Sequence, residues 1–314
     1  MVQSPYVRID RPASCTSCVH EAMATQWEFW LSGHDPDYLR QAAREAFARI
    51  DELEDKLSLY RESSDVSRIN LARPGAEVRV SDETRDCLLI ALRMSALTQG
   101  AFHAFLGIQS LHAKGQAMPA HLQSLHSPAG DRSSDPIVGI SEGGNLVHKL
   151  REGSLLDLGA LGKGFALDLA AATLEEWEIS QACLIAGGSS VLALDPPDGS
   201  PSYMANLPGR STPLCFSRIA LGASGLGFQP AHIVNPQDEN LRPLHNRAYA
   251  AASSAAEADA LSTAAMNLAC EILQKISGDQ PRYSFLVRKT GPSPSDDWFS
   301  CGKFFDSSDE RVVV

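Results

Sequence analysis

Two short segments, far apart in the chain, combine residue types that bind phosphates and metal ions. The first, Asp157-Leu-Gly-Ala-Leu-Gly-Lys163-Gly, places a carboxylate, three glycines and a lysine between an apolar run and an expected helix. The second, Ala258-Asp259-Ala-Leu-Ser-Thr263-Ala, places Asp259 and Thr263 four residues apart on an expected helix, so that both oxygens project from one face. Together they suggest a magnesium-assisted reaction on a phosphorylated cofactor.

The glycine-rich segment is consistent with two interpretations. Turns that open a helix suit phosphate binding, because the first helical N–H groups are unpaired and the helix dipole favours anions. The segment is neither GxGxxG nor a Walker sequence, so a structural tight turn fits equally well, and Lys163 favours the phosphate only slightly. Gly187-Gly188 leaves a similar choice between close backbone approach to a ligand and a bulge.

The Asp259 and Thr263 pair also has two interpretations. Hard cations such as magnesium or calcium take carboxylate, hydroxyl and carbonyl oxygens, which this pair could supply. Alternatively, Asp259 is favoured by the helix dipole and Thr263 bonds back to its own helix. Spacing alone does not decide between them.

His232 lies in Gln-Pro-Ala-His-Ile-Val-Asn-Pro, between an apolar pair and two prolines. A histidine held there could act as a general base. A single histidine is more often a packed or solvated residue, and the sequence context does not exclude that. The hypothesis of a catalytic base therefore needs support from the other segments.

The apolar periodicity predicts a mixture of helices and short strands. Helices are expected from Asp35 to about Leu59, after a Ser81 cap, from about Gly164 to Trp177, and after a capping box at Ser254-Ala-Ala-Glu257. Strands are expected at 25–31, 137–140, 145–150, 154–158, 183–186 and 191–194. Because the elements do not alternate as βαβ units, the fold class is expected to be α+β.

Composition describes an ordinary globular protein. The 314 residues, 44% of them hydrophobic, are enough for one large domain or two small ones. The net charge of −11 and the scattered lysines and arginines argue against nucleic acid as a partner. No stretch approaches the roughly 20 apolar residues of a membrane-spanning helix.

The ends of the chain and its cysteines suggest a cytoplasmic protein. The N-terminal segment has no apolar run typical of a signal peptide, and seven cysteines, an odd number, fit a reducing compartment. Residues 1–22 are expected to form a flexible tail, in which Cys15 and Cys18 make a lone CxxC. Residues 23–306 are expected to form a single catalytic domain with a polar loop at about 112–136, followed by a tail at 307–314.

Taken in order, the motifs resemble the ApbE family of FAD:protein FMN transferases, from about Met23 to Gly302. The matching segments are Met23-Ala-Thr25, Ser58-Leu-Tyr60 through Asn70, Gly100-Ala-Phe-His103, Asp157 through Asp168, Ala186-Gly-Gly188, Ser224-Gly225, His232-Ile233 with Pro236, and Asp259-Ala-Leu-Ser-Thr263. Any one of these would be weak evidence, and the ordered set is strong.

The resemblance implies a fold of T-fold type, with FAD in a cleft between two similar halves. It implies a magnesium ion held by the Ala160 carbonyl, Asp259 and Thr263. It also implies a general base, His232, for transfer of FMN from FAD to a threonine or serine hydroxyl of a target protein, with release of AMP. The implied flavin-nucleotide contacts are Met23, Tyr60, Ala101, Phe102, His103, Asp157, Lys163 and Ile233.

Several positions depart from the family pattern. His103 replaces an aspartate, Ser189 replaces an acidic residue, and the hairpin after Ser224-Gly225 is abbreviated. The polar 112–136 segment replaces the family's helix between the halves, and the leader common in the family is absent. Two alternatives therefore stay open: a hydrolase that splits FAD into FMN and AMP, and a non-catalytic FAD-binding protein.

Overall fold

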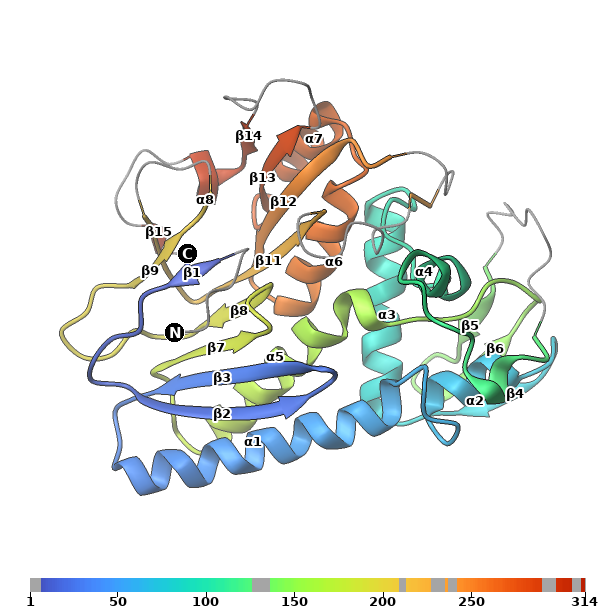
Figure 1. Cartoon of the computed structure of the whole chain (residues 1–314), viewed down its shortest axis with the longest axis horizontal. Coiled ribbons are helices and arrows are strands. Elements are labelled where there is room, and N and C mark those ends of the chain that lie inside the picture. The colour runs from blue at the N-terminus through green and yellow to red at the C-terminus, as the bar shows by residue number, and fades with distance from the viewer. Residues whose placement is uncertain are drawn as a thin grey trace.

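The computed structural model describes residues 7–125, 136–208, 213–226, 235–236, 242–289, 298–306 and 312–313. Its centre is an eight-stranded antiparallel sheet with the order β14-β13-β12-β11-β8-β7-β3-β2 (Figure 1). In that order the strands are β14 (Trp298–Cys301), β13 (Ser284–Lys289), β12 (His245–Ala252), β11 (Ile219–Gly225), β8 (Ser190–Ala193), β7 (Ala182–Ala186), β3 (Thr25–Leu31) and β2 (Thr16–Ala22).

Helices α1 (Pro36–Leu57), α5 (Gly159–Glu176) and α6 (Ala255–Ala265) cover one face of this sheet. The α1 helix forms because Asp35 caps it, Pro36 occupies its first turn, and apolar residues recur along one stripe. Alternation along β3 fits the layers, since Trp27, Phe29 and Leu31 join the core beneath the helices.

A second core lies on the other face of the sheet and includes Trp30 of β3. It is covered by a four-stranded sheet with the order β1-β9-β10-β15. These strands are β1 (Arg8–Ile9), β9 (Tyr203–Asn206), β10 (Leu214–Ser217) and β15 (Val312–Val313). The large sheet is therefore buried between two layers.

A smaller part of the molecule lies at the far end of α1 (Figure 1). It contains a three-stranded sheet with the order β4-β6-β5 and several short helices. Its elements are α2 (Asp65–Leu71), β4 (Glu77–Arg79), α3 (Asp82–Leu97), α4 (Gly107–Ala113), η1 (Ala120–Leu122), β5 (Val138–Ile140) and β6 (Leu146–Lys149). Two further helices, α7 (Cys270–Asp279) and α8 (Lys303–Asp306), lie near the β13 end of the large sheet.

The structure confirms the α+β class, the strand at 25–31 and the Ser81 cap. It corrects the expected flexible tail, because β2 pairs with β3 along its whole length and forms an edge of the large sheet. The expected polar loop contains the end of α4 and η1, and the expected C-terminal tail contributes β15. Residues 154–158 form no strand, and α5 begins at Gly159, earlier than expected.

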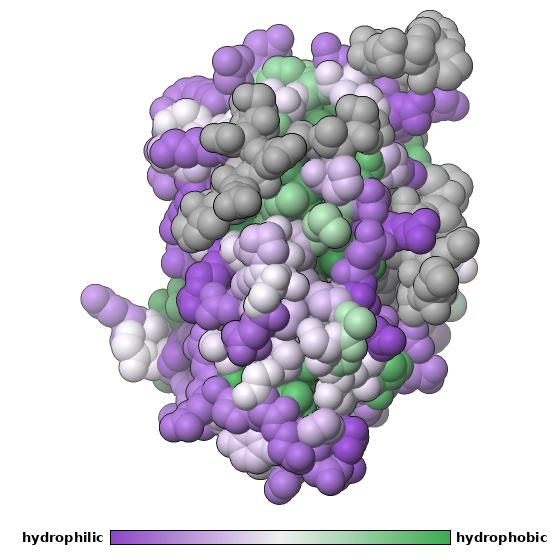
Figure 2. Space-filling model, turned by 90° about the vertical axis from the view of Figure 1, so that its left-hand side faces the viewer, coloured by the Kyte–Doolittle hydropathy of each residue, from purple (hydrophilic) through white to green (hydrophobic). Residues whose placement is uncertain are grey.

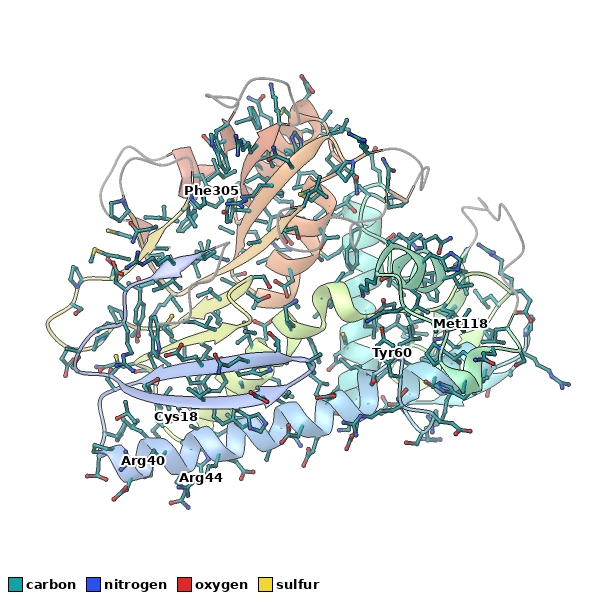
Figure 3. The ribbon with its side chains drawn as sticks, viewed as in Figure 1. Cys18, Arg40, Arg44, Tyr60, Met118 and Phe305 are labelled. Atoms are coloured by element: carbon teal, nitrogen blue, oxygen red, sulfur yellow. The ribbon has the colours of Figure 1, made fainter. Side chains whose placement is uncertain are left out.

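Cys15 and Cys18 do not form a functional pair. Both are free thiols, and they pack against different cores, Cys18 beneath α1 and Cys15 on the other side of the large sheet. Burial raises the pKa of the Cys18 thiol, against the opposing effect of the nearby Arg40 and Arg44 (Figure 3).

The surface is mixed in character. None of the helices in the described ranges has the length and apolar character needed to cross a membrane. On the face shown in Figure 2, hydrophobic residues form separate small areas between polar ones.

Helix α6 packs very closely against both α5 and the large sheet. A Cβ atom on Gly164 of α5 would lie 2.1 Å from the Ala255 carbonyl oxygen, and one on Gly222 of β11 would lie 2.3 Å from the Ala258 carbonyl oxygen. Both obstacles are backbone atoms, which cannot rotate away. The two glycines therefore set the distances of α6 from α5 and from the sheet.

We expect Gly164→Ala to lower the free energy of unfolding by about 3 kcal/mol, because the added methyl group overlaps the backbone of α6. Gly162→Ala is the matched control: it lies in the same helix, and a Cβ atom there meets nothing within 4 Å. The free energy of unfolding of that variant should rise by about 1 kcal/mol, because alanine has a higher helix propensity than glycine. Urea unfolding of both proteins measures the difference, and equal stabilities would refute the packing argument.

Candidate active site

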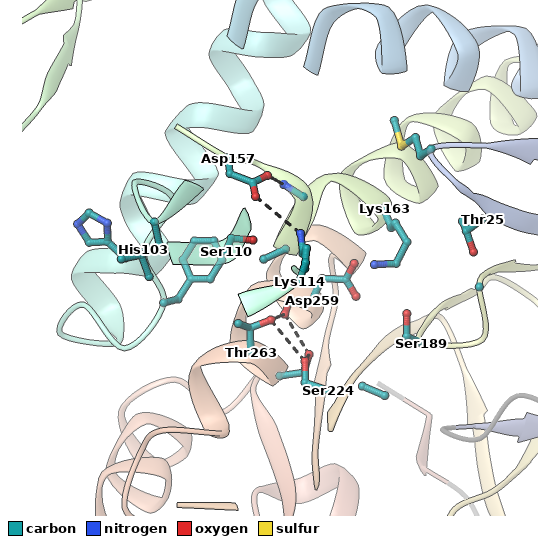
Figure 4. Close-up of a pocket in the computed structure, with 18 of the residues that line it drawn as sticks. Thr25, His103, Ser110, Lys114, Asp157, Lys163, Ser189, Ser224, Asp259 and Thr263 are labelled. Atoms are coloured by element: carbon teal, nitrogen blue, oxygen red, sulfur yellow. Dashed lines mark hydrogen bonds and ion pairs between the residues drawn. The ribbon is translucent and has the colours of Figure 1, made fainter. Parts of the chain in front are cut away.

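A cavity of about 450 Å³ lies where the large sheet and its helices meet the smaller part (Figure 4). Its walls come from the β2–β3 turn, the 101–106 segment, α4, the start of α5, the β7–β8 turn, the end of β11 and α6. The predicted site residues that line it are Met23, Ala101, Phe102, His103, Asp157, Ala160, Lys163, Asp259 and Thr263. The two segments singled out in the sequence therefore meet in space.

Three predicted residues are not among the described residues of the wall. Tyr60 is 54% exposed and is not part of the wall; its hydroxyl donates to Gln116 Oε1 at 2.6 Å. Burial and then the charge of Asp157 raise the pKa of Tyr60. His232 and Ile233 lie outside the described residues, although Pro236 of the same segment does line the cavity.

Asp259 is a buried carboxylate held by hydrogen bonds from two other elements. Its Oδ2 accepts a hydrogen bond from the Gly164 amide at 2.9 Å. Its Oδ1 accepts one from the Ser190 hydroxyl at 2.7 Å. Burial raises the pKa of Asp259 to about 6, although Lys163 and the two hydrogen bonds favour the charged form. A bound cation would stabilise the carboxylate that burial disfavours.

Thr263 makes the hydrogen bond back to its own helix that was expected as the alternative to cation binding. Its hydroxyl donates to the Asp259 carbonyl oxygen at 3.1 Å and lies 3.4 Å from the Ser224 hydroxyl. Donation uses the single hydroxyl hydrogen, so that a lone pair can still serve as a ligand. The back-bonding therefore orients Thr263 and does not exclude cation binding.

Ala160, the third expected ligand, also lines the cavity, in the first turn of α5. The Gly164 amide, which a regular helix would pair with the Ala160 carbonyl, donates to Asp259 Oδ2 at 2.9 Å. Among the described residues there is no cluster of three or more His, Cys, Asp or Glu side chains. Carboxylate, hydroxyl and carbonyl oxygens suit magnesium, which commonly takes one or two carboxylates together with phosphate oxygens and water.

A second carboxylate holds α6 in place from the opposite direction. Asp168 of α5 accepts the Ser254 hydroxyl at 2.7 Å and the Ala255 and Ala256 amides at 2.8 and 3.0 Å. Burial raises the pKa of Asp168, while these three bonds oppose the shift. Ser254 also caps α6 as predicted, by accepting the Glu257 amide. Each helix thus supplies a carboxylate to the backbone of the other.

The remaining walls answer the questions left open by the sequence. Gly187 and Gly188 have φ angles of 57° and 68° and form the β7–β8 turn, of which Gly187 faces the cavity. His103 accepts the Phe105 amide through Nδ1, and burial lowers its pKa, so it does not replace the charge of a carboxylate. The expected phosphate turn is helical from Gly159, whose amide donates to Asp157 Oδ1 at 2.8 Å.

Sequence reasoning missed three polar residues. Ser110 and Lys114, which line the cavity, lie at the border of the expected polar loop, and Ser190, which binds Asp259, follows the noted Ser189. None belongs to a local motif. Only the pairing of distant elements reveals them.

The α+β fold encloses a cavity whose wall includes two lysines, two aspartates and several hydroxyl-bearing residues. The ApbE family model matches residues 23–284, and the chain belongs to this family. It is 26% identical over 236 residues to the FAD:protein FMN transferase of Vibrio cholerae serotype O1, covering 69% of this chain and 70% of that protein. The FAD:protein FMN transferase of Salmonella typhimurium is 23% identical over 297 residues, or 86% and 83% of the two chains.

Solved structures show the same fold. The apo crystal structure of the Pseudomonas stutzeri flavinyl transferase ApbE superposes with a TM-score of 0.73 at 20% identity, covering 93% of this chain and 96% of that one. This likeness extends over both parts of the molecule.

We expect the affinity of the cavity for magnesium to be constant above pH 6 and to fall below it. The folded pKa of Asp259 is raised to about 6, so acidification protonates the carboxylate that would bind the ion. One competing proton lowers the affinity about tenfold for each pH unit below that pKa. Calorimetry with ADP as a diphosphate probe measures this, and an unchanged affinity at pH 5 would exclude Asp259 as a ligand.

Proposed function

We propose that this protein transfers FMN from FAD to a threonine or serine hydroxyl of a target protein and releases AMP, with magnesium as cofactor. The observation that carries the proposal is the meeting of Lys163, Asp259 and Thr263 in one cavity of about 450 Å³. Family membership and the names of the curated relatives support the same reaction.

Magnesium would be held by Asp259, Thr263 and the Ala160 carbonyl, the hard oxygens of the cavity. When bound, the ion supplies positive charge that stabilises a diphosphate as its phosphorus is attacked. Lys163 lies on the same wall and adds a fixed positive charge. Phosphoryl transfer needs such positioning and charge neutralisation more than covalent help from the enzyme.

The flavin ring would lie against the apolar part of the wall. Ala101 and Phe102 are buried there, and Met23 reaches the cavity from the β2–β3 turn. Met23 and Ala24 both have positive φ angles, 50° and 55°, and Glu54 accepts the Met23 amide at 2.6 Å. That bond holds the strained turn against the cavity. His103 and Asp157 would contact polar atoms of the nucleotide, and Ile233 is proposed as a further apolar contact.

In the transfer step, the acceptor hydroxyl oxygen attacks the FMN phosphorus of FAD. A phosphoester bond forms to the acceptor, the bond from that phosphorus to the bridging oxygen breaks, and AMP leaves with the bridging oxygen. His232 is proposed to accept the hydroxyl proton. The product is a target protein that carries FMN covalently.

The direct test uses an extract of the host cells from which the gene for this protein has been deleted. Added enzyme, FAD and magnesium should produce a flavin-fluorescent band that survives denaturing electrophoresis. Asp259→Ala should abolish it, because the proposed cation site loses its carboxylate ligand. Free FMN and AMP without a labelled band would indicate a hydrolase, and unchanged FAD would indicate a binding protein; either result overturns the proposal.

We expect His232→Ala to slow transfer by about 10²–10⁴-fold, the usual contribution of a general base. The affinity for FAD should change little, because the role is proton transfer. Single-turnover rates and equilibrium binding separate the two effects. His34→Ala, an exposed position near the end of β3, is the control. A loss confined to FAD affinity would make His232 a binding residue.

A further inference from the structure

The cavity contains a second lysine that no motif assigns. Lys114 is the residue that follows α4, and it lines the cavity together with Ser110, one turn earlier in the helix (Figure 4). Lys163 lines the same cavity from α5. In the sequence, Lys114 precedes Asp157 and Lys163 follows it. Two ammonium groups from different parts of the fold therefore share one cavity.

The ammonium group of Lys114 is only loosely paired. Its Nζ lies 3.9 Å from Asp157 Oδ2, whereas a charge-assisted hydrogen bond has a length of about 2.7–2.9 Å. Asp157 already accepts the Gly159 amide through Oδ1. Within the described part of the chain this is the one ion pair of Lys114. An ammonium group has three donors, so donors remain for a ligand.

The segment that carries Lys114 is anchored at three points. The Gly107 amide donates to the Leu155 carbonyl at 2.9 Å, and the Ser154 hydroxyl donates to Gln109 Oε1 at 2.9 Å. The Tyr60 hydroxyl donates to Gln116 Oε1, two residues beyond Lys114. These contacts fix the segment as a wall of the cavity. They also give Tyr60 a role outside the wall itself.

Two aspartates and two lysines share the wall of the cavity. Lys163 lies near enough to Asp259 to favour the charged form of that carboxylate. The ammonium group of Lys114 lies 3.9 Å from Asp157 Oδ2. A dinucleotide with a diphosphate offers negative charge that would compete with Asp157 for Lys114.

We infer that Lys114 is a second cationic contact for the diphosphate of the donor, and that it leaves Asp157 for a phosphate oxygen when the donor binds. This inference rests on the proposed function, because it takes FAD as the donor. It identifies Lys114 as a residue that selects phosphorylated flavins over the free ring.

We expect Lys114→Met to raise the dissociation constant of FAD about tenfold, equivalent to about 1.4 kcal/mol. The affinity for riboflavin, which has the flavin ring and no phosphate, should not change. Quenching of flavin fluorescence by the purified protein measures both affinities without an acceptor or turnover.

Two further variants serve as controls. Lys114→Arg should retain the affinity for FAD, because a guanidinium group also donates to phosphate. Lys275→Met removes an exposed lysine of α7 that pairs with Asp279, and it should alter neither affinity.

An equal loss of FAD and riboflavin affinity would show that Lys114 only supports the wall, and an unchanged FAD affinity would show that it does not contact phosphate. Either result overturns the inference and leaves the proposed function standing. A wild-type protein that binds no flavin would overturn the proposed function, and this inference with it.

Discussion

The site depends on the close contact between α5 and α6. Gly164 removes the side chain that would separate the two backbones, and two buried carboxylates then tie the helices together in opposite directions. Asp168 binds the first amides of α6, where the helix dipole stabilises its charge. Asp259 binds an amide of α5 and remains at the edge of the cavity. The same interaction that packs the helices thus fixes the position of the Asp259 carboxylate.

This arrangement explains why a buried acid is tolerated. An unpaired buried carboxylate is costly, and burial accordingly raises the pKa of Asp259 to about 6. The Ser190 hydroxyl and the Gly164 amide offset part of that cost. A divalent ion shared with a diphosphate would offset the rest.

Local patterns in the sequence predicted much of the site. The four-residue spacing of Asp259 and Thr263 placed both on one face of a helix, and the structure has them together at the cavity. The aromatic strand at 25–31 and the α1 helix followed from periodicity and capping. In each case the signal lies within a few turns of chain, where spacing alone determines which side chains are neighbours.

Features that depend on distant partners could not be predicted. The sequence places Gly164 at the end of a glycine-rich turn that opens a helix, whereas it lies inside α5, where the backbone of α6 leaves no room for a side chain. The β2 strand is polar at many positions because it is an edge, and only its pairing with β3 reveals it. Lys114 reaches the cavity because distant residues anchor its segment.

The most direct test of the account is electron–nuclear double resonance on the protein with FAD and Mn²⁺ in place of Mg²⁺. The account predicts phosphorus couplings typical of direct coordination that disappear in Asp259→Ala. Bound Mn²⁺ without such couplings, or couplings that survive the substitution, would contradict it.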